Sequence, residues 1–153
     1  MNRSGLVNGA SSKLCLYIHR LSHYAWNAKF HKTGRMLQLL NRFLTGADID
    51  CQAYLHQDIF VPHTVGLVVG ETARVEKGVV LMPHVVLGAK AHVKKEVRHP
   101  WVKENAYIGA GAVLLGPIII GEAAVVGANA VVVNDVSPDV TVVGIPARPV
   151  DIK

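Results

Sequence analysis

Three of the eight histidines in the chain lie where an otherwise regular spacing of aliphatic residues is interrupted. His63 lies in the first interruption, and His92 and His99 lie in the second. Imidazole changes its charge near neutral pH, so a histidine can take a proton from a hydroxyl group, and it is also a common metal ligand. These positions indicate chemistry at two loops that leave a repetitive scaffold.

An aliphatic residue at every sixth position defines the scaffold that must hold these loops. The series comprises Ile49, Leu55 and Val61, then Val69, Val75, Leu81 and Leu87, and finally Val102, Ile108, Leu114, Ile120, Val126 and Val132. Neither the period of a helix nor the alternation of a strand keeps this count. A six-residue repeat predicts a mainly β fold, the parallel β-helix, in which three hexads form one turn of a triangular coil around an aliphatic interior.

Two steps in this series are longer than six residues. The step from Val61 to Val69 is eight residues, and the step from Leu87 to Val102 is fifteen. A solenoid expels inserted residues as loops, often on its binding face. The two insertions therefore mark the predicted site.

Residues 12–44 have a different period. Apolar residues recur there at helical intervals: Leu14, Ile18, Leu21, Ala25, Phe30, Met36, Leu37, Leu40 and Leu44. Gly34 is predicted to separate two helices. We therefore divide the chain into an N-terminal helical hairpin, residues 1–46, and a β-helix domain with a C-terminal cap, residues 47–153. The hairpin is expected to pack on the first coils or on a neighbouring subunit.

Composition restricts the class of protein. Half of the residues are apolar, 18% are charged, and the net charge is +5 with neutral histidines. The basic, aromatic hairpin gives weak support for membrane association, and no nucleic-acid-binding motif accompanies it. Cys15 and Cys51 lack metal or redox spacing, and neither a signal peptide nor an apolar run of membrane-spanning length is evident. We expect a soluble cytoplasmic protein.

Four segments resemble the serine acetyltransferase-like family of hexapeptide-repeat acyltransferases. They are NRFLTGADID (41–50), PHTVGLVVGETARVEKGVVL (62–81), RHPWVKENAYIGAGAVLLG (98–116) and VVGIPARPV (142–150). The resemblance covers the chain from the second predicted helix to its end. It implies a left-handed coil, acetyl-CoA as the acetyl donor and no metal.

The family's catalytic dyad corresponds by motif to His63 and Asp48. The histidine takes the proton of the acceptor hydroxyl while that oxygen attacks the thioester, which is worth roughly 10²–10⁴-fold in rate. The coil phase agrees, because Asp48 precedes the first side of the coil that His63 ends, about one strand spacing away. The resemblance further implies that His99 binds the acceptor or the tetrahedral intermediate, with Arg98 orienting the substrate.

The resemblance implies that acetyl-CoA lies along the outside of the coils. Its pantetheine arm is expected against a set of small residues, namely Gly109, Ala110, Gly111, Ala112, Ala128 and Asn129. Arg148 is expected to bind a nucleotide phosphate, whereas Val125 stands where a basic residue would be expected. Family members are trimers with active sites between subunits, so we expect a homotrimer.

Pro62 determines the acceptor that we predict. Family members that acetylate serine hold the amino acid with one acidic residue from the helical domain and another just before the base histidine. Pro62 occupies the second position, and no Asp or Glu precedes Asp48. We therefore expect a sugar hydroxyl of a capsular or surface polysaccharide, with serine, the acceptor in cysteine biosynthesis, as the alternative.

Two further classes of protein share this kind of coil. A zinc hydratase would use three histidines across a subunit boundary, and His63, His84 and His92 are the candidates. A non-catalytic trimeric scaffold would make the Asp48 and His63 pairing incidental. The zinc hydratase class leaves the RHP and GIPAR motifs unexplained.

Overall fold

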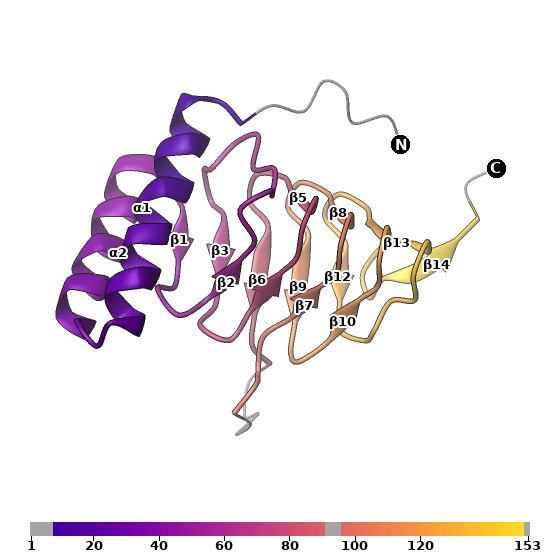
Figure 1. Cartoon of the computed structure of the whole chain (residues 1–153). Helices are drawn as coiled ribbons and strands as arrows, with labels where there is room; N and C mark the ends of the chain where they lie inside the picture. Colours follow the sequence, from indigo (N-terminus) through magenta and orange to yellow (C-terminus); the bar gives the residue numbers. More distant parts are fainter. Residues whose placement is uncertain (1–7, 91–95, 152–153) are drawn as a thin grey trace.

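The computed structural model describes residues 8–90 and 96–151. Two helices come first, α1 (Ala10–Asn27) and α2 (His31–Thr45), and they lie side by side across one end of a coil of short strands (Figure 1). The first strand starts at Asp48, directly after the second helix. His92, which falls within residues 91–95, lies outside the described residues.

The coil has three faces, each a sheet of stacked strands. Face A contains β1 (Asp48–Ile49), β3 (Val68–Val69), β6 (Val86–Gly88), β9 (Val113–Leu115) and β12 (Val131–Val132). Face B contains β2 (Tyr54–Leu55), β4 (Arg74–Val75), β7 (Trp101–Val102) and β10 (Ile119–Ile120). Face C contains β5 (Val80–Leu81), β8 (Tyr107–Ile108), β11 (Val125–Val126), β13 (Thr141–Val143) and β14 (Arg148–Val150). All pairings are parallel except that of β13 with β14, which ends the coil.

The predicted hexad residues form the interior of this prism. Every one of them except Leu55 is at most 2% exposed, and Leu55 packs against the core from its edge. Residues eighteen positions apart pair in adjacent coils, as Leu114 does with Val132. The predicted parallel β-helix with an N-terminal helical hairpin is therefore confirmed.

The break between the two helices differs from the prediction. The chain turns at residues 28–30, where Lys29 has a φ of 66°, and Gly34 lies inside α2. The hydroxyl of Ser22 donates to the carbonyl oxygen of Gly34 at 2.8 Å, and a Cβ on Gly34 would lie 3.2 Å from the carbonyl oxygen of Ser22. Gly34 is thus the point of close approach between the helices, where a side chain would push them apart.

Many of the apolar residues that revealed the helices are exposed. Leu14, Leu21, Phe30, Met36, Leu40 and Leu44 are all more than 40% exposed. The second helix instead buries Gly34, Asn41 and Thr45, and the Asn41 amide donates to the carbonyl oxygen of Cys15 at 3.1 Å. No helix among the described residues has the length and apolar character needed to cross a membrane.

Candidate active site

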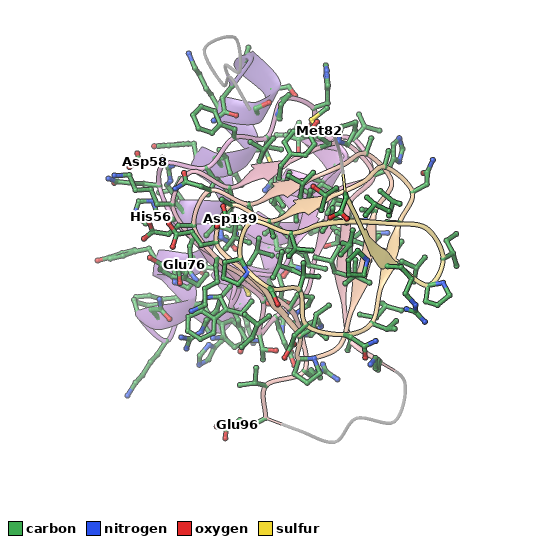
Figure 2. The ribbon with its side chains drawn as sticks, turned by 90° about the vertical axis from the view of Figure 1, so that its right-hand side faces the viewer. His56, Asp58, Glu76, Met82, Glu96 and Asp139 are labelled. Carbon is green, nitrogen blue, oxygen red and sulfur yellow. The ribbon has the colours of Figure 1, made fainter. Side chains whose placement is uncertain are left out.

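Most of the predicted site residues lie at two of the three corners of the prism, whereas Asp48 lies in β1 and Arg148 in β14. We call the turn from face C to face A the C/A corner, and the turn from face A to face B the A/B corner. Figure 2 views the coil from its C-terminal end: Met82, just before the C/A corner, and Glu96, at the A/B corner, lie on opposite sides of the molecule. The two corners are therefore separate surfaces of one chain.

Successive coils form a continuous row along the C/A corner. Backbone hydrogen bonds connect its members: His84 N to Val65 O at 3.0 Å, Gly111 N to Pro83 O at 2.9 Å, and Asn129 N to Ala110 O at 2.8 Å. The C-terminal turn continues the row, because the amide of Val131 donates to the carbonyl oxygen of Gly144 at 3.0 Å. His63 and the small residues predicted to contact acetyl-CoA thus belong to the same row.

His63 has a fixed backbone and a free side chain. The hydroxyl of Thr64 donates to the carbonyl oxygen of Thr45 at 2.6 Å, and the hydroxyl of Ser12 donates to the carbonyl oxygen of Pro62 at 3.4 Å. The imidazole of His63 is exposed and has no hydrogen-bond partner within the described part of the chain. This geometry suits a group that must receive a proton from a bound molecule.

Asp48 lies at the start of β1, where the second helix contacts its carboxylate. Gln38 Nε2 donates to one carboxylate oxygen at 3.2 Å, and the guanidinium of Arg42 lies 3.4 Å from the other. The amide of Gly66 donates to the carbonyl oxygen of Gly46 at 3.1 Å, which brings the turn after His63 next to this strand. Among the described residues, no hydrogen bond joins Asp48 to His63, so the dyad itself stays a prediction.

His99 lies at the A/B corner and is only 7% exposed. Its Nδ1 accepts the backbone N–H of Thr72 at 3.2 Å and lies 2.9 Å from the hydroxyl oxygen of Thr72. Burial lowers the pKa of His99 below its ordinary value, and the charge of Arg98 lowers this pKa further. His99 is therefore neutral near pH 7. The sequence did not identify Thr72 as its partner.

The ring of His99 lies over Gly70, the residue that follows β3. A Cβ on Gly70 would overlap Nε2 and Cδ2 of His99, so only glycine leaves room for the ring. Nε2 has no hydrogen-bond partner in residues 8–90 and 96–151, and it is not among their fully buried unpartnered atoms. One ring nitrogen is thus held by Thr72, while the other has no partner among the described residues and is not fully buried.

Arg98 is already paired in this chain. Its guanidinium donates to the Glu71 carboxylate at 2.7 Å, and both side chains are half-buried. A hollow of about 490 Å³ lies beside this pair and is lined by residues that include Glu71, Thr72 and Arg74. A negatively charged substrate at this corner would meet Arg98, with Glu71 competing for it.

The residues predicted to contact acetyl-CoA differ in what they can offer. Ala112 is fully buried, so its side chain belongs to the core. A Cβ on Gly109 would lie 2.6 Å from the backbone nitrogen of Ala128, which shows that this glycine permits close stacking of the coils. Ala128 and Asn129 are exposed, as is Arg148 in β14. The row therefore offers a narrow surface of backbone and small side chains that ends at a cation.

His63 and His99 lie at opposite edges of face A. His63 precedes β3 by one corner, whereas His99 covers Gly70 directly after β3. A single chain therefore does not bring the two histidines together. A second copy whose A/B corner faced the C/A corner of the first would do so.

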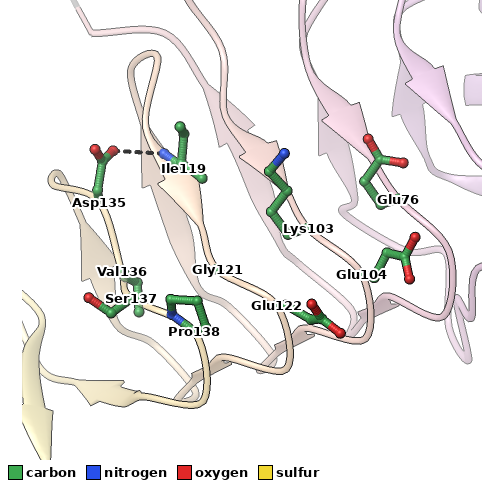
Figure 3. Close-up of a pocket in the computed structure, with 10 residues that line it drawn as sticks. All are labelled: Glu76, Lys103, Glu104, Ile119, Gly121, Glu122, Asp135, Val136, Ser137 and Pro138. Carbon is green, nitrogen blue, oxygen red and sulfur yellow. Dashed lines mark hydrogen bonds between the residues drawn. The ribbon is translucent and has the colours of Figure 1, made fainter.

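The residues that the structure describes contain no group of three or more His, Cys, Asp or Glu side chains able to hold a metal ion. A further hollow, of about 660 Å³, lies on face B and is lined by residues that include Glu76, Lys103, Glu122 and Asp135 (Figure 3). Neither His63 nor His99 lines it.

Comparisons with known proteins identify relatives of this chain. Residues 99–134 match the model of the bacterial transferase hexapeptide (six repeats). The chain is 43% identical to the serine acetyltransferase of Mycobacterium tuberculosis, over 85% of this chain and 56% of that protein. It is 36% identical to the serine acetyltransferase of Helicobacter pylori, over 94% of this chain and 81% of that protein.

Solved structures of serine acetyltransferases also match this chain. Soybean serine acetyltransferase complexed with serine matches with a TM-score of 0.89 and 38% identity, over 93% of this chain and 58% of that one. A serine acetyltransferase in complex with CoA matches with a TM-score of 0.83 and 38% identity, over 89% of this chain and 55% of that one. These matches confirm the left-handed sense of the coil.

The chain spans 56%, 61% and 60% of three of the curated relatives. It nevertheless covers 81% of the Helicobacter pylori protein at 36% identity, and 93% of it is covered by the match to the soybean structure. The chain belongs to the serine acetyltransferase family of hexapeptide-repeat transferases.

Proposed function

We propose that this chain is an acetyl-CoA-dependent O-acetyltransferase that acetylates the hydroxyl group of serine. The observation that carries the proposal is the C/A corner row, in which the His63 imidazole, unpartnered among the described residues, and a narrow surface of small residues lie in line. Family membership supports the proposal, since one solved relative is complexed with serine and another with CoA.

Serine replaces the sugar hydroxyl that the sequence favoured. The relatives reported above are serine acetyltransferases and give no support to a polysaccharide acceptor. Pro62 remains a departure from the pattern of serine-acetylating relatives, because its ring has no polar atom for an ammonium group. In this proposal the acceptor's carboxylate is recognised at the A/B corner, by His99 and Arg98.

The proposed reaction needs one base and no covalent enzyme intermediate. His63 takes the proton of the serine hydroxyl as its oxygen attacks the thioester carbonyl, the C–S bond then breaks, and the imidazolium of His63 returns the proton to the CoA thiolate. Asp48 stabilises the imidazolium that forms on His63. The small residues of the C/A row contact the pantetheine arm, and Arg148 binds a phosphate at the other end of the donor.

We further propose that the active form is a homotrimer with its sites between subunits. Because His63 and His99 lie at opposite edges of face A, a cyclic arrangement can place the C/A corner of one copy against the A/B corner of the next. Each of the three sites then contains one His63 and one His99 from different chains.

Thiol release from acetyl-CoA tests the activity, with serine and with a panel of sugars as acceptors. Wild type is expected to turn over with serine, and His63→Gln to lose roughly 10²–10⁴-fold in kcat. The control is His56→Gln, an imidazole outside both corners. Turnover with a sugar alone would refute serine as the acceptor, and equal rates for wild type and His63→Gln would refute the base.

Mixed trimers test the shared site. His63→Gln and His99→Asn chains are each expected to be inactive, whereas trimers reassembled from both contain some sites with intact His63 and His99. Recovery of activity on mixing supports sites between subunits. Mixed trimers that stay inactive would show that each site belongs to a single chain.

A further inference from the structure

We propose that Thr72 is a positioning residue that holds His99 in the neutral tautomer with its proton on Nε2, so that His99 acts only as a hydrogen-bond donor to an anionic oxygen. The last step rests on the proposed acetyl transfer, since that oxygen is either the acceptor's carboxylate or the oxyanion of the tetrahedral intermediate. The tautomer itself depends only on contacts within the chain.

The hydroxyl of Thr72 has three neighbours, which together fix the direction of its proton. Its oxygen lies 3.0 Å from the backbone nitrogen of Arg98 and 3.1 Å from that of His99. Both of these N–H groups can only donate, and a hydroxyl has two lone pairs and one proton. The two amides therefore use both lone pairs, which leaves the proton for His99 Nδ1 at 2.9 Å.

The backbone N–H of Thr72 likewise requires Nδ1 of His99 to be an acceptor. Its N–H also points at Nδ1, at 3.2 Å. A ring nitrogen that accepts two donors must carry a lone pair, so the proton of the neutral imidazole is on Nε2. A proton on Nδ1 would point at the protons of the Thr72 hydroxyl and of the Thr72 backbone N–H, which is unfavourable.

Nε2 is the atom that remains available to a ligand. It lies over Gly70 and is not fully buried, although His99 as a whole is only 7% exposed. A donor fixed in this way matches an oxygen that gains negative charge during the reaction, and it cannot take a proton from the acceptor hydroxyl. The geometry therefore separates the role of His99 from that of His63.

The first test is the nitrogen NMR spectrum of the histidine-labelled wild-type protein, with the His99 signals assigned by their loss in His99→Asn. At pH 7 we expect Nε2 protonated and Nδ1 unprotonated. Thr72→Ser should keep this pattern, whereas Thr72→Val, which removes the hydroxyl and leaves the backbone N–H as the remaining and longer contact to Nδ1, should shift part of the population to the tautomer with its proton on Nδ1. A wild-type proton on Nδ1, or an unchanged pattern in Thr72→Val, overturns the proposal even if serine is not the acceptor.

The second test is kinetic. Thr72→Val is expected to lose about ten- to a hundredfold in kcat/KM for the acceptor, with Thr72→Ser recovering most of the loss. A raised KM assigns the anionic oxygen to the acceptor's carboxylate, and a lowered kcat assigns it to the oxyanion. Thr33→Val, at an exposed position of α2, is the matched control and should behave as wild type. Wild-type kinetics in Thr72→Val would refute the positioning role.

Discussion

The two corners at the edges of face A hold their histidines in opposite ways. At the C/A corner the imidazole of His63 is exposed and meets no partner in the described chain, while the backbone beside it is tied down. At the A/B corner the ring of His99 is 7% exposed and one nitrogen accepts two hydrogen bonds from Thr72.

This difference follows from what each group has to do. A general base must gain and lose a proton in every cycle, so a nitrogen with an internal donor could not serve. A group that stabilises developing charge works best when its orientation is fixed before the substrate arrives. The fold therefore supplies one adaptable and one rigid histidine on the same face.

After replacement of His63 itself, the largest loss at the C/A corner should come from neutralising the Asp48 carboxylate. Asp48→Asn is expected to lower kcat about a hundredfold, because the amide no longer stabilises an imidazolium on His63. Asp50→Asn is the control, since that carboxylate binds Arg35 at 2.8 Å. Steady-state kinetics with serine measure both, and an equal loss in the two variants would deny Asp48 a catalytic role.

A third histidine, His19, is expected to make the free energy of unfolding depend on pH. Burial lowers the pKa of His19 from 6.5 to about 4. In the unfolded chain this group binds a proton as the pH falls below about 6.5, but the folded chain resists until about pH 4. The free energy of unfolding should therefore fall with pH across this window, by roughly 3 kcal/mol at about 1.4 kcal/mol per pKa unit.

Urea unfolding between pH 7 and pH 4.5 measures this loss. His19→Asn should flatten the pH dependence, whereas His84→Asn, at an exposed residue with a φ of 59° that asparagine tolerates, should keep it. If His19→Asn has the slope of wild type, the acid sensitivity belongs elsewhere, His99 being the next candidate.

The A/B corner should respond to a single methyl group. In Gly70→Ala the new Cβ would displace the ring of His99, and overpacking of this kind costs about 1–3 kcal/mol in the free energy of unfolding. Gly88→Ala is a matched control one coil further on face A, where the Cβ would meet the flexible end of Leu115 at 3.1 Å. Serine turnover should therefore fall in Gly70→Ala and not in Gly88→Ala. An equal loss in both variants would mean that displacement of His99 does not cause it.

The smallest expected effect concerns the far end of the C/A row. The side chain of Arg148 is exposed, and within the part of the chain that the structure describes it bonds only to the neighbouring carbonyl of Ala147, so Arg148→Ala should leave the fold intact. We expect a KM for acetyl-CoA raised about two- to fivefold at low salt, with the difference shrinking as salt is added. Lys32→Ala, on the second helix, should leave this KM alone, and a salt-independent effect would contradict a phosphate contact.

The regular part of the fold could be predicted because each hexad repeats the same local rule. Counting every sixth residue from Val102 to Val132 was enough to find the core positions, and the structure buries all of these hexad residues. The helices were detectable by period, but their buried faces were not, because Asn41 and Thr45 make polar contacts that hydropathy does not reveal. Gly34 was misassigned as a break because close helix packing and helix ends both favour glycine.

The position of a candidate site residue on the coil was predictable where the hexad count is continuous and not where it is interrupted. His63 lies two residues after Val61, which ends the unbroken series that starts at Ile49, so its corner could be assigned by counting. The partner of His99 lies 27 residues away, across the insertion between Leu87 and Val102, so no period connects Thr72 to it. Only the folded chain brings that hydroxyl to the ring.

The C/A row also sets a length. From His63 to the C-terminal turn before Arg148 there are four steps between coils, which at ~4.8 Å per step span about 19 Å. A donor that reacts at one end and is held by its charge at the other must bridge that distance with a long, thin chain. Removing or adding one coil would shorten or extend this span by about 4.8 Å and thereby change which donor molecules fit, without altering any residue that performs chemistry.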